Sequence, residues 1–206
     1  MKTIYLIDEY IELSDKYRES YGEKTVILIQ VGGFFEIYAV KNENENLGAD
    51  IYTICDILNI QITRKTKSVI EVDKSNYLQA GFPNHATKKF IDILINHEYT
   101  IVLYEQVTTT SPPKRAVTQI ISPSTYFDDT RISDSRGMMV MYFEKSVCWR
   151  TRYESIILGW SHFDTVTGDL KIGEITTVND YKLFMDDIHK LLLVRNPKEI
   201  VVISKE

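Results

Sequence analysis

Apolar runs typical of buried strands alternate along this chain with amphipathic helical patterns, and this order restricts the fold more than any other feature. Residues 24–31 (KTVILIQV) are one such run, and they follow a helical pattern over residues 3–21. Strand patterns at 99–107 and 115–122 follow a second helical pattern at 86–97. Interleaved strands and helices predict an α/β fold, here with a mixed sheet.

The other elements of this first part are less regular. We expect a helix at 49–60, a short strand at 61–65, and a strand leading into a Gly-Phe-Pro turn within 76–86. The polar stretch at 41–48 (KNENENLG) predicts an inserted loop. The helix at 86–97 is expected to carry on one face Ala86, Phe90, Ile93, Leu94 and His97.

A polar, patternless stretch at 123–137 marks the predicted domain boundary, so we expect one domain at 1–125 and a second at 126–206. The second domain shows three strand patterns, then a helical pattern, then a final strand. These five elements are expected at 138–145, 155–164, 169–175, 181–192 and 199–204. They make an incomplete α/β unit, which predicts that the second domain is cut short and that the chain is a fragment of a larger protein.

The composition is that of a globular protein with a real core. Of the 206 residues, 44% are hydrophobic and 26% are charged. No apolar run approaches the roughly 18 residues that a membrane span needs, and the first residues become acidic too soon for a signal peptide. Cys55 and Cys148 lie far apart with no Cys-X-X-Cys spacing. They predict buried thiols in a reducing, intracellular compartment, whether cytoplasm, nucleoid, nucleus or an organelle.

The net charge of −5 is not typical of a nucleic-acid-binding protein, but the charge is uneven. Residues 64–89 include six basic and two acidic residues, which gives this stretch a net charge of +4. The basic residues are Arg64, Lys65, Lys67, Lys74, Lys88 and Lys89. A solvated surface is the plainer interpretation of this stretch, and a phosphate-binding surface is the alternative.

The sequence predicts no catalytic residues and no metal site. It contains no phosphate-binding glycine loop, no dinucleotide fingerprint and no HExxH motif, and its four histidines are scattered. Asp164 follows a strand pattern, as a metal-binding aspartate does in nucleases of the RNase H type. A two-metal site needs several convergent carboxylates, however. We therefore favour a turn aspartate that accepts hydrogen bonds from backbone amides.

The segment GGFFE, residues 32–36, poses a different question. Alternation along a strand sends Phe34 and Phe35 to opposite faces, so one ring can fill the core while the other stays exposed. An exposed ring beside a carboxylate suits base recognition, because the ring can stack on an unpaired base while Glu36 hydrogen-bonds to its edge. Burial of both rings in the core is the alternative interpretation.

Six segments resemble, in the right order, motifs of the MutS family of DNA mismatch-repair proteins. GGFFEIY is similar to the family's Gly-Asp-Phe-Tyr-Glu segment, and QAGFPNHA is similar to its Ala-Gly-Ile-Pro-Tyr-His-Ala segment. NIQITRK, and KRAVTQIISPSTYFDD with its Arg-Xaa-Val pattern, match further blocks of the recognition domain. ILGWSHFDTVTGDLKIGE and LLLVRNPKEIVVI resemble the family's connector domain. These segments cover nearly all of the chain.

The resemblance implies a mismatch-recognition domain at 1–125 and an RNase H-like connector at 126–206, with no catalytic activity in this chain. Phe34 would stack on the mispaired base, Glu36 would hydrogen-bond to it, and Phe35 would point inward. The implied DNA-binding residues are Phe34, Glu36, Val31, Gly33, Arg64, Lys65, Lys67, Gly81, Phe82, Pro83 and His85. ATP and Mg²⁺ would belong to an ATPase domain beyond Glu206. The implied partners are mismatched double-stranded DNA, a MutS-like dimer partner and a MutL-like protein, without a membrane.

The chain departs from the family pattern at several places, which predicts a divergent subfamily. Gly33 replaces an aspartate, Asn84 replaces a tyrosine, and Thr66 stands where the family usually has glycine. The segment between Glu36 and Thr63 is longer by several residues. Two other functions are therefore kept open: a MutS-fold module that binds DNA structures or proteins without mismatch specificity, and a metal-dependent nuclease. The nuclease would use Asp164, which matches a family aspartate that is not catalytic.

Overall fold

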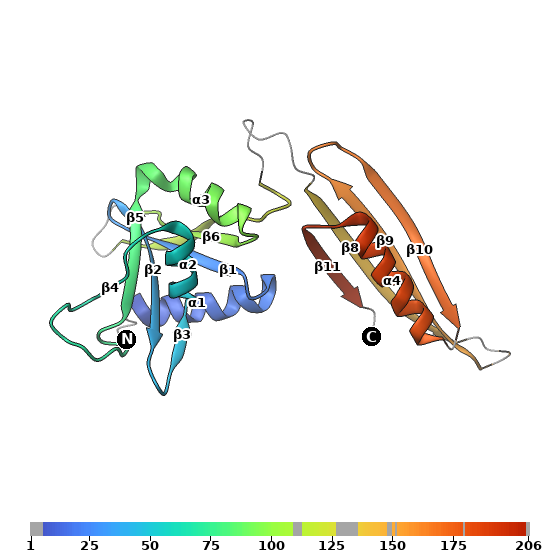
Figure 1. Ribbon diagram of the computed structural model, residues 1–206, viewed down its shortest axis with the longest axis horizontal. Helices are drawn as coiled ribbons and strands as arrows, with labels where there is room; N and C mark the ends of the chain where they lie inside the picture. The colour runs from blue at the N-terminus through green and yellow to red at the C-terminus, as the bar shows by residue number, and fades with distance from the viewer. Residues whose placement is uncertain are drawn as a thin grey trace. The chain divides into compact units, whose positions relative to one another are not determined.

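A computed structural model of the protein describes residues 6–108, 113–126, 136–147, 150, 152–178 and 180–204. The chain divides into two compact units, residues 1–122 and 123–206, each with its own mixed sheet (Figure 1). The α/β fold predicted from the alternating sequence pattern is therefore confirmed. Within the described ranges, no helix is long and apolar enough to cross a membrane.

The first unit is built on a seven-stranded sheet with the strand order β4-β5-β2-β1-β6-β7, and β3 pairs with β2. Strand β1 is parallel to β6 and antiparallel to β2. The strands are β1 (Thr25–Val31), β2 (Phe34–Lys41), β3 (Asn46–Gly48), β4 (Thr63–Arg64), β5 (Leu78–Pro83), β6 (Thr100–Gln106) and β7 (Arg115–Ile121). The helices are α1 (Leu6–Tyr21), α2 (Ile51–Leu58), α3 (Thr87–Asn96) and the 3₁₀ turn η1 (Asn84–Ala86).

Helices cover both faces of this sheet. On one face, Tyr10 of α1 is fully buried and its ring meets that of Tyr38 of β2 edge-on, with 5.2 Å between the centroids. On the other face, Phe90 of α3 stacks on Phe82 of β5 at 4.2 Å, and Phe82 contacts Phe35 of β2. Helix α2 packs beside α3. The central strand β2 therefore lies between two aromatic layers.

Three local predictions were wrong. The last part of the polar stretch at 41–48 is not loop but strand β3, because its backbone pairs with β2. The Gly-Phe-Pro segment is not a turn but the end of strand β5, and the chain turns in η1 instead. Helix α3 begins at Thr87 and ends at Asn96, so Ala86 and His97 flank it. The residues that α3 buries are Ile91, Leu94 and Ile95.

The second unit has a four-stranded sheet with the order β10-β9-β8-β11. Its elements are β8 (Gly137–Val147), β9 (Glu154–Asp164), β10 (Leu170–Val178), α4 (Tyr181–Arg195) and β11 (Glu199–Ser204). Strands β8, β9 and β10 form an antiparallel meander, and β11 pairs with β8 in parallel after the crossover through α4. The buried core lies between the sheet and α4 and comprises Met139, Met141, Leu158, Phe184 and Ile188.

The ends of α4 have clear local causes. The Asp180 side chain accepts a hydrogen bond of 3.0 Å from the backbone N–H of Leu183, which caps the start of the helix. Asn196 adopts the left-handed conformation at its end, and Pro197 follows. Of the two predicted buried thiols, Cys55 is confirmed as buried and free, and burial raises the pKa of its thiol to about 11. Cys148 lies outside the described residues.

Replacing Leu158 by alanine should destabilise the second unit by about 2–5 kcal/mol, because this fully buried side chain lies at the centre of a small core. Both tryptophans of the chain lie in residues 123–206, so urea unfolding followed by tryptophan fluorescence reports on this unit. The matched control is Leu193→Ala on α4, where the side chain is 67% exposed. Equal midpoints for the two variants would contradict the packing described.

Candidate functional site

A two-residue glycine turn joins β1 to β2 and places the paired phenylalanines. Val31 pairs with Phe34, and Gly32 and Gly33 lie between them. Gly32 has a φ of +58°, which favours glycine, as the first position of a tight hairpin turn often does. The strand that leaves this turn exposes Phe34 by 50% but buries Phe35 to 4%.

Phe35 anchors the beginning of β2 in the core. Its ring lies 6.3 Å from that of Phe82, which in turn stacks on Phe90. Because side chains alternate along a strand, this anchor directs Phe34 and Glu36 to the opposite face of the sheet. Phe82, one of the implied DNA-binding residues, is itself only 2% exposed, so its side chain packs in the core against Phe35 of β2.

Strand β5 holds the other side of β2. Phe34 pairs with Pro83 and Glu36 pairs with Gly81. A Cβ atom on Gly81 would lie 2.5 Å from the carbonyl oxygen of Phe35, so only glycine allows the strands to come this close. Val31 is half-buried beside the turn, and His85 is exposed in η1.

Asn84, which stands where the family pattern has a tyrosine, ties the glycine turn to η1. Its backbone N–H donates a hydrogen bond of 2.9 Å to the carbonyl oxygen of Gly33. Its side-chain amide also donates to the carbonyl oxygen of Gly32, at 3.4 Å. The turn that presents Phe34 is therefore held from both sides, by β1 and by η1.

A shallow depression of about 370 Å³ opens beside Phe34 and Glu36. Its other lining residues come from β4, β5 and the segment after α2, and they are Ile60, Gln61, Thr63, Gln79, Ala80 and Gly81. The glutamine side chains add amide donors and acceptors to a surface that sequence analysis described only by its ring and its carboxylate. No motif in the sequence singled them out, since β4 and β5 meet only in the folded sheet.

Glu36 is half-buried, and its Oε2 atom accepts a hydrogen bond of 2.5 Å from the hydroxyl of Tyr38. Desolvation of the buried phenol, together with the neighbouring carboxylate, raises the pKa of Tyr38 well above its ordinary value. The phenol therefore remains a hydrogen-bond donor at neutral pH. Tyr38 was not predicted as a site residue, although its spacing of two residues from Glu36 places both side chains on one face of β2.

The predicted basic residues begin on β4, next to β5, and continue into the loop that follows. Arg64 is half-buried and donates a hydrogen bond of 3.3 Å to the backbone oxygen of Lys67, while Lys65 and Lys67 are exposed. The ammonium of Lys65 lies 5.2 Å from the centre of the Tyr77 ring. Lys74 forms an ion pair of 3.1 Å with Asp8 of α1.

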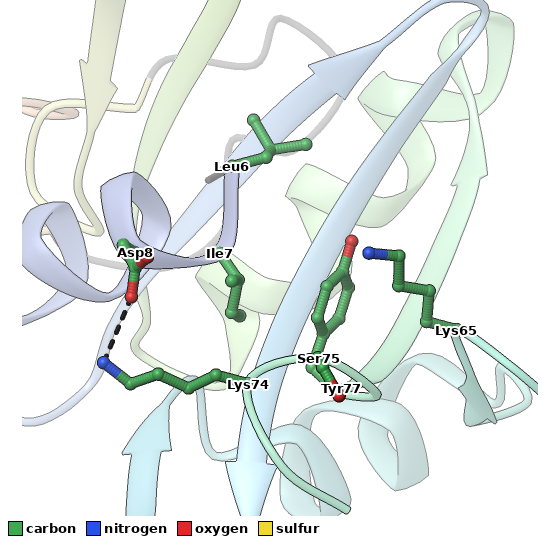
Figure 2. Close-up of a pocket in the computed structure, with 7 residues that line it drawn as sticks. All are labelled: Leu6, Ile7, Asp8, Lys65, Lys74, Ser75 and Tyr77. Carbon is green, nitrogen blue, oxygen red and sulfur yellow. Dashed lines mark hydrogen bonds and ion pairs between the residues drawn. The ribbon is translucent and has the colours of Figure 1, made fainter. Parts of the chain in front are cut away.

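Figure 2 shows Lys65 beside Tyr77, and Lys74 bonded to Asp8, in the wall of a pocket of about 480 Å³. The pocket and the depression share none of their described lining residues, although both border strands β4 and β5 or the segment between them. Lys65 and Lys74 thus line the pocket, while Phe34 and Glu36 line the depression.

Asp164 lies in the second unit and behaves as a turn aspartate. Its carboxylate is buried and accepts hydrogen bonds from the backbone N–H groups of Val166, at 2.9 Å, and Thr167, at 3.3 Å. This confirms the interpretation favoured from the sequence. Among the residues that the structure describes, no group of three or more His, Cys, Asp or Glu side chains is arranged to hold a metal ion.

Comparison with known proteins points to one family. The family model MutS domain I matches residues 6–130, more than half of the chain. A mutS homologue of Acanthamoeba polyphaga mimivirus is 26% identical over 203 residues, covering 98% of this chain and 18% of the relative. DNA mismatch repair protein MutS of Listeria welshimeri is 27% identical over 209 residues, which cover 94% of this chain and 21% of that relative.

The fold and the match together define a chain that carries a MutS domain I followed by a second α/β unit. This chain belongs to the MutS family of DNA mismatch-repair proteins. It spans 18 to 21% of the length of these two curated relatives.

Substituting Gly81 by alanine should lower the free energy of unfolding of the first unit by about 1–3 kcal/mol, because the added methyl group meets the backbone of β2. The matched control is Gly33→Ala, where a Cβ atom meets nothing within 4 Å and φ is not positive. Urea unfolding followed by far-UV circular dichroism measures both. If the two variants unfolded at the same urea concentration, the close approach of β2 and β5 would not matter for stability.

Proposed function

We propose that this chain recognises mispaired bases in double-stranded DNA as part of a larger MutS-like protein. One observation carries the proposal: of two adjacent phenylalanines, Phe35 is 4% exposed and Phe34 is 50% exposed. The buried ring stabilises the sheet, and the exposed ring lies at the end of a braced hairpin. An aromatic ring held in this way has the position that insertion into a base stack requires.

Phe34 would test the stability of a base step. Unstacking a duplex costs least at a mispaired or damaged site, so a ring that wedges between bases enters there more easily. The ring then stacks on the base, and stacking is tolerant of base identity. The short hairpin braced by β1, β5 and η1 supports this role, because a rigid wedge loses little conformational freedom on binding.

Glu36 would read the edge of the same base. Its carboxylate lines the depression that also borders Phe34, and its second oxygen is available for a hydrogen bond to the base. An unpaired carboxylate also repels the phosphate backbone, which disfavours DNA that offers the wedge no opening. The glutamines of the depression, Gln61 and Gln79, are further groups within reach of a base edge.

Arg64, Lys65 and Lys67 would hold the DNA backbone. Arg64 ends β4, which pairs with β5, the strand beside β2, so this stretch adds positive charge next to the sheet edge while the whole chain carries −5. Phosphate contacts of this kind orient a protein on DNA without reading sequence. The discrimination would then come from DNA deformability, tested by Phe34, and from the hydrogen bond of Glu36.

We further propose that the chain works as a segment of a longer, intracellular protein. One observation that supports this proposal is that the chain spans only 18 to 21% of the length of the two MutS relatives. A second is the apolar surface of strand β11, where Ile200, Val201, Val202 and Ile203 are each 43 to 63% exposed. Further protein would cover this strand, as part of an RNase H-like connector. ATP with Mg²⁺, a MutS-like dimer partner and a MutL-like protein would engage other domains.

The alternatives lead to different measurements. A MutS-fold module without mismatch specificity would bind paired and mispaired duplexes equally. A nuclease that used Asp164 would cleave DNA only with Mg²⁺ present, and Asp164→Ala would abolish the cleavage. The backbone bonds that Asp164 accepts disfavour the nuclease, because they engage one oxygen of the carboxylate, Oδ1, within its own turn.

The proposal predicts that Phe34→Ala weakens binding to a G·T duplex by roughly 5- to 150-fold, the affinity equivalent of losing one stacked base. Binding to the fully paired duplex should hardly change. Fluorescence anisotropy at one stated salt concentration measures both, in the longest natural form of the protein that carries these residues.

Two further variants control this experiment. Tyr52→Ala removes an aromatic ring of similar exposure, 54%, from helix α2 and should leave the preference unchanged. Phe35→Ala removes the buried neighbour and should unfold the first unit or destabilise it by about 3–5 kcal/mol. Equal binding of wild-type protein to both duplexes, unchanged by Phe34→Ala, would mean that the fold persists without mismatch reading.

A further inference from the structure

The face of β2 that carries Phe34 and Glu36 also carries a third side chain, Tyr38. The three residues alternate along the strand, so their side chains leave the sheet in the same direction. The hydroxyl of Tyr38 donates to Oε2 of Glu36 at 2.5 Å. Distances of about 2.5–2.7 Å are typical of strong O–H···O⁻ bonds to a carboxylate. The base-reading carboxylate is therefore held by a neighbour on its own strand.

Tyr38 is a rigid donor because its ring is locked in the core. Only 1% of the residue is exposed. The ring of Tyr10 meets it edge-on at 5.2 Å, and that of Tyr77 lies at 4.9 Å. Tyr10 is fixed in turn, since its own hydroxyl donates to the carbonyl oxygen of Ile27 at 3.0 Å. The packing between α1 and the sheet therefore fixes the position of the Tyr38 hydroxyl.

The Glu36 side chain is flexible, in contrast to the rigid ring of Tyr38. It is half-buried at the rim of an open depression, and its long side chain has several torsions to order. A flexible carboxylate would have to be immobilised when it meets a base, and that ordering opposes binding. The bond from Tyr38 restricts the carboxylate beforehand and leaves Oε1 for the incoming base.

We propose that Tyr38 is a positioning residue for mismatch reading: its hydroxyl holds the Glu36 carboxylate in the orientation that meets the mispaired base. This inference rests on the proposed function, because it assigns Tyr38 a part in the hydrogen bond of Glu36. Tyr77 extends the same aromatic cluster toward Lys65, whose ammonium lies over its ring (Figure 2). The reading carboxylate and a backbone-binding lysine thus share one rigid support.

The test removes one oxygen atom. Tyr38→Phe keeps the buried ring and deletes the donor. We expect affinity for a G·T duplex to fall about 3- to 10-fold, the effect of releasing one ordered side chain, while affinity for the paired duplex stays the same. Tyr77→Phe is the matched control, because it deletes a hydroxyl from the same buried cluster and leaves the bond between Tyr38 and Glu36 intact.

A double-mutant cycle with Glu36→Ala separates positioning from a general structural role. If Tyr38 acts through Glu36, Tyr38→Phe has no further effect on mismatch affinity once the carboxylate is gone. Equal losses in both backgrounds, or equal losses for Tyr38→Phe and Tyr77→Phe, would overturn the inference. Urea unfolding of each variant confirms that the folded state is compared.

Phe34→Ala, measured in parallel, distinguishes the two proposals. If Phe34→Ala abolishes the mismatch preference and Tyr38→Phe retains it in full, the proposed function stands and the positioning role is wrong. If the wild-type protein shows no preference for the mismatch, both proposals are wrong.

Discussion

The burial of one ring, Phe35, beneath strand β2 is the interaction on which the candidate site depends. Phe35 packs on Phe82, which stacks on Phe90 of α3, and this packing determines which side chains of β2 point toward α3 and which point to the opposite face. A slip of one residue in the strand register would exchange the buried and exposed rings. Pairing with β1 on one side and β5 on the other prevents that slip, so the exposure of Phe34 follows from the sheet as a whole.

Stability and the proposed recognition of DNA are divided between adjacent residues. Phe35 contributes apolar burial, whereas Phe34, half exposed at a turn, contributes little to the core. The backbone around the two rings determines where they lie. Gly32 supplies the positive φ of the turn, and Gly81 allows the close approach of β5 to β2. Because the core does not need the ring of Phe34, this ring is free to bind a partner, provided that its backbone is held rigidly. Strands β1 and β5 and the turn η1 hold that backbone.

Most of the secondary structure could be predicted, because apolar spacing reflects burial directly. Strand β3 could not, since its polar residues gain strand structure only from pairing with β2. The Gly-Phe-Pro segment looks like a turn by composition, yet Pro83 is the last residue of β5, a position where a strand can accept proline. Asn84 and Tyr38 were missed for a related reason. Their contacts involve neighbours whose faces and distances are decided only when the strands assemble.

The sequence by itself determined that Phe34 and Phe35 lie on opposite faces of a strand, that a glycine turn precedes them, and that the chain has a MutS-like order of segments. These properties follow from local backbone geometry and from the spacing of residue types. Only the tertiary structure decided which of the two rings is exposed and that a buried tyrosine holds Glu36. Each depends on which helix covers which face, and that is settled by packing between residues far apart in the chain.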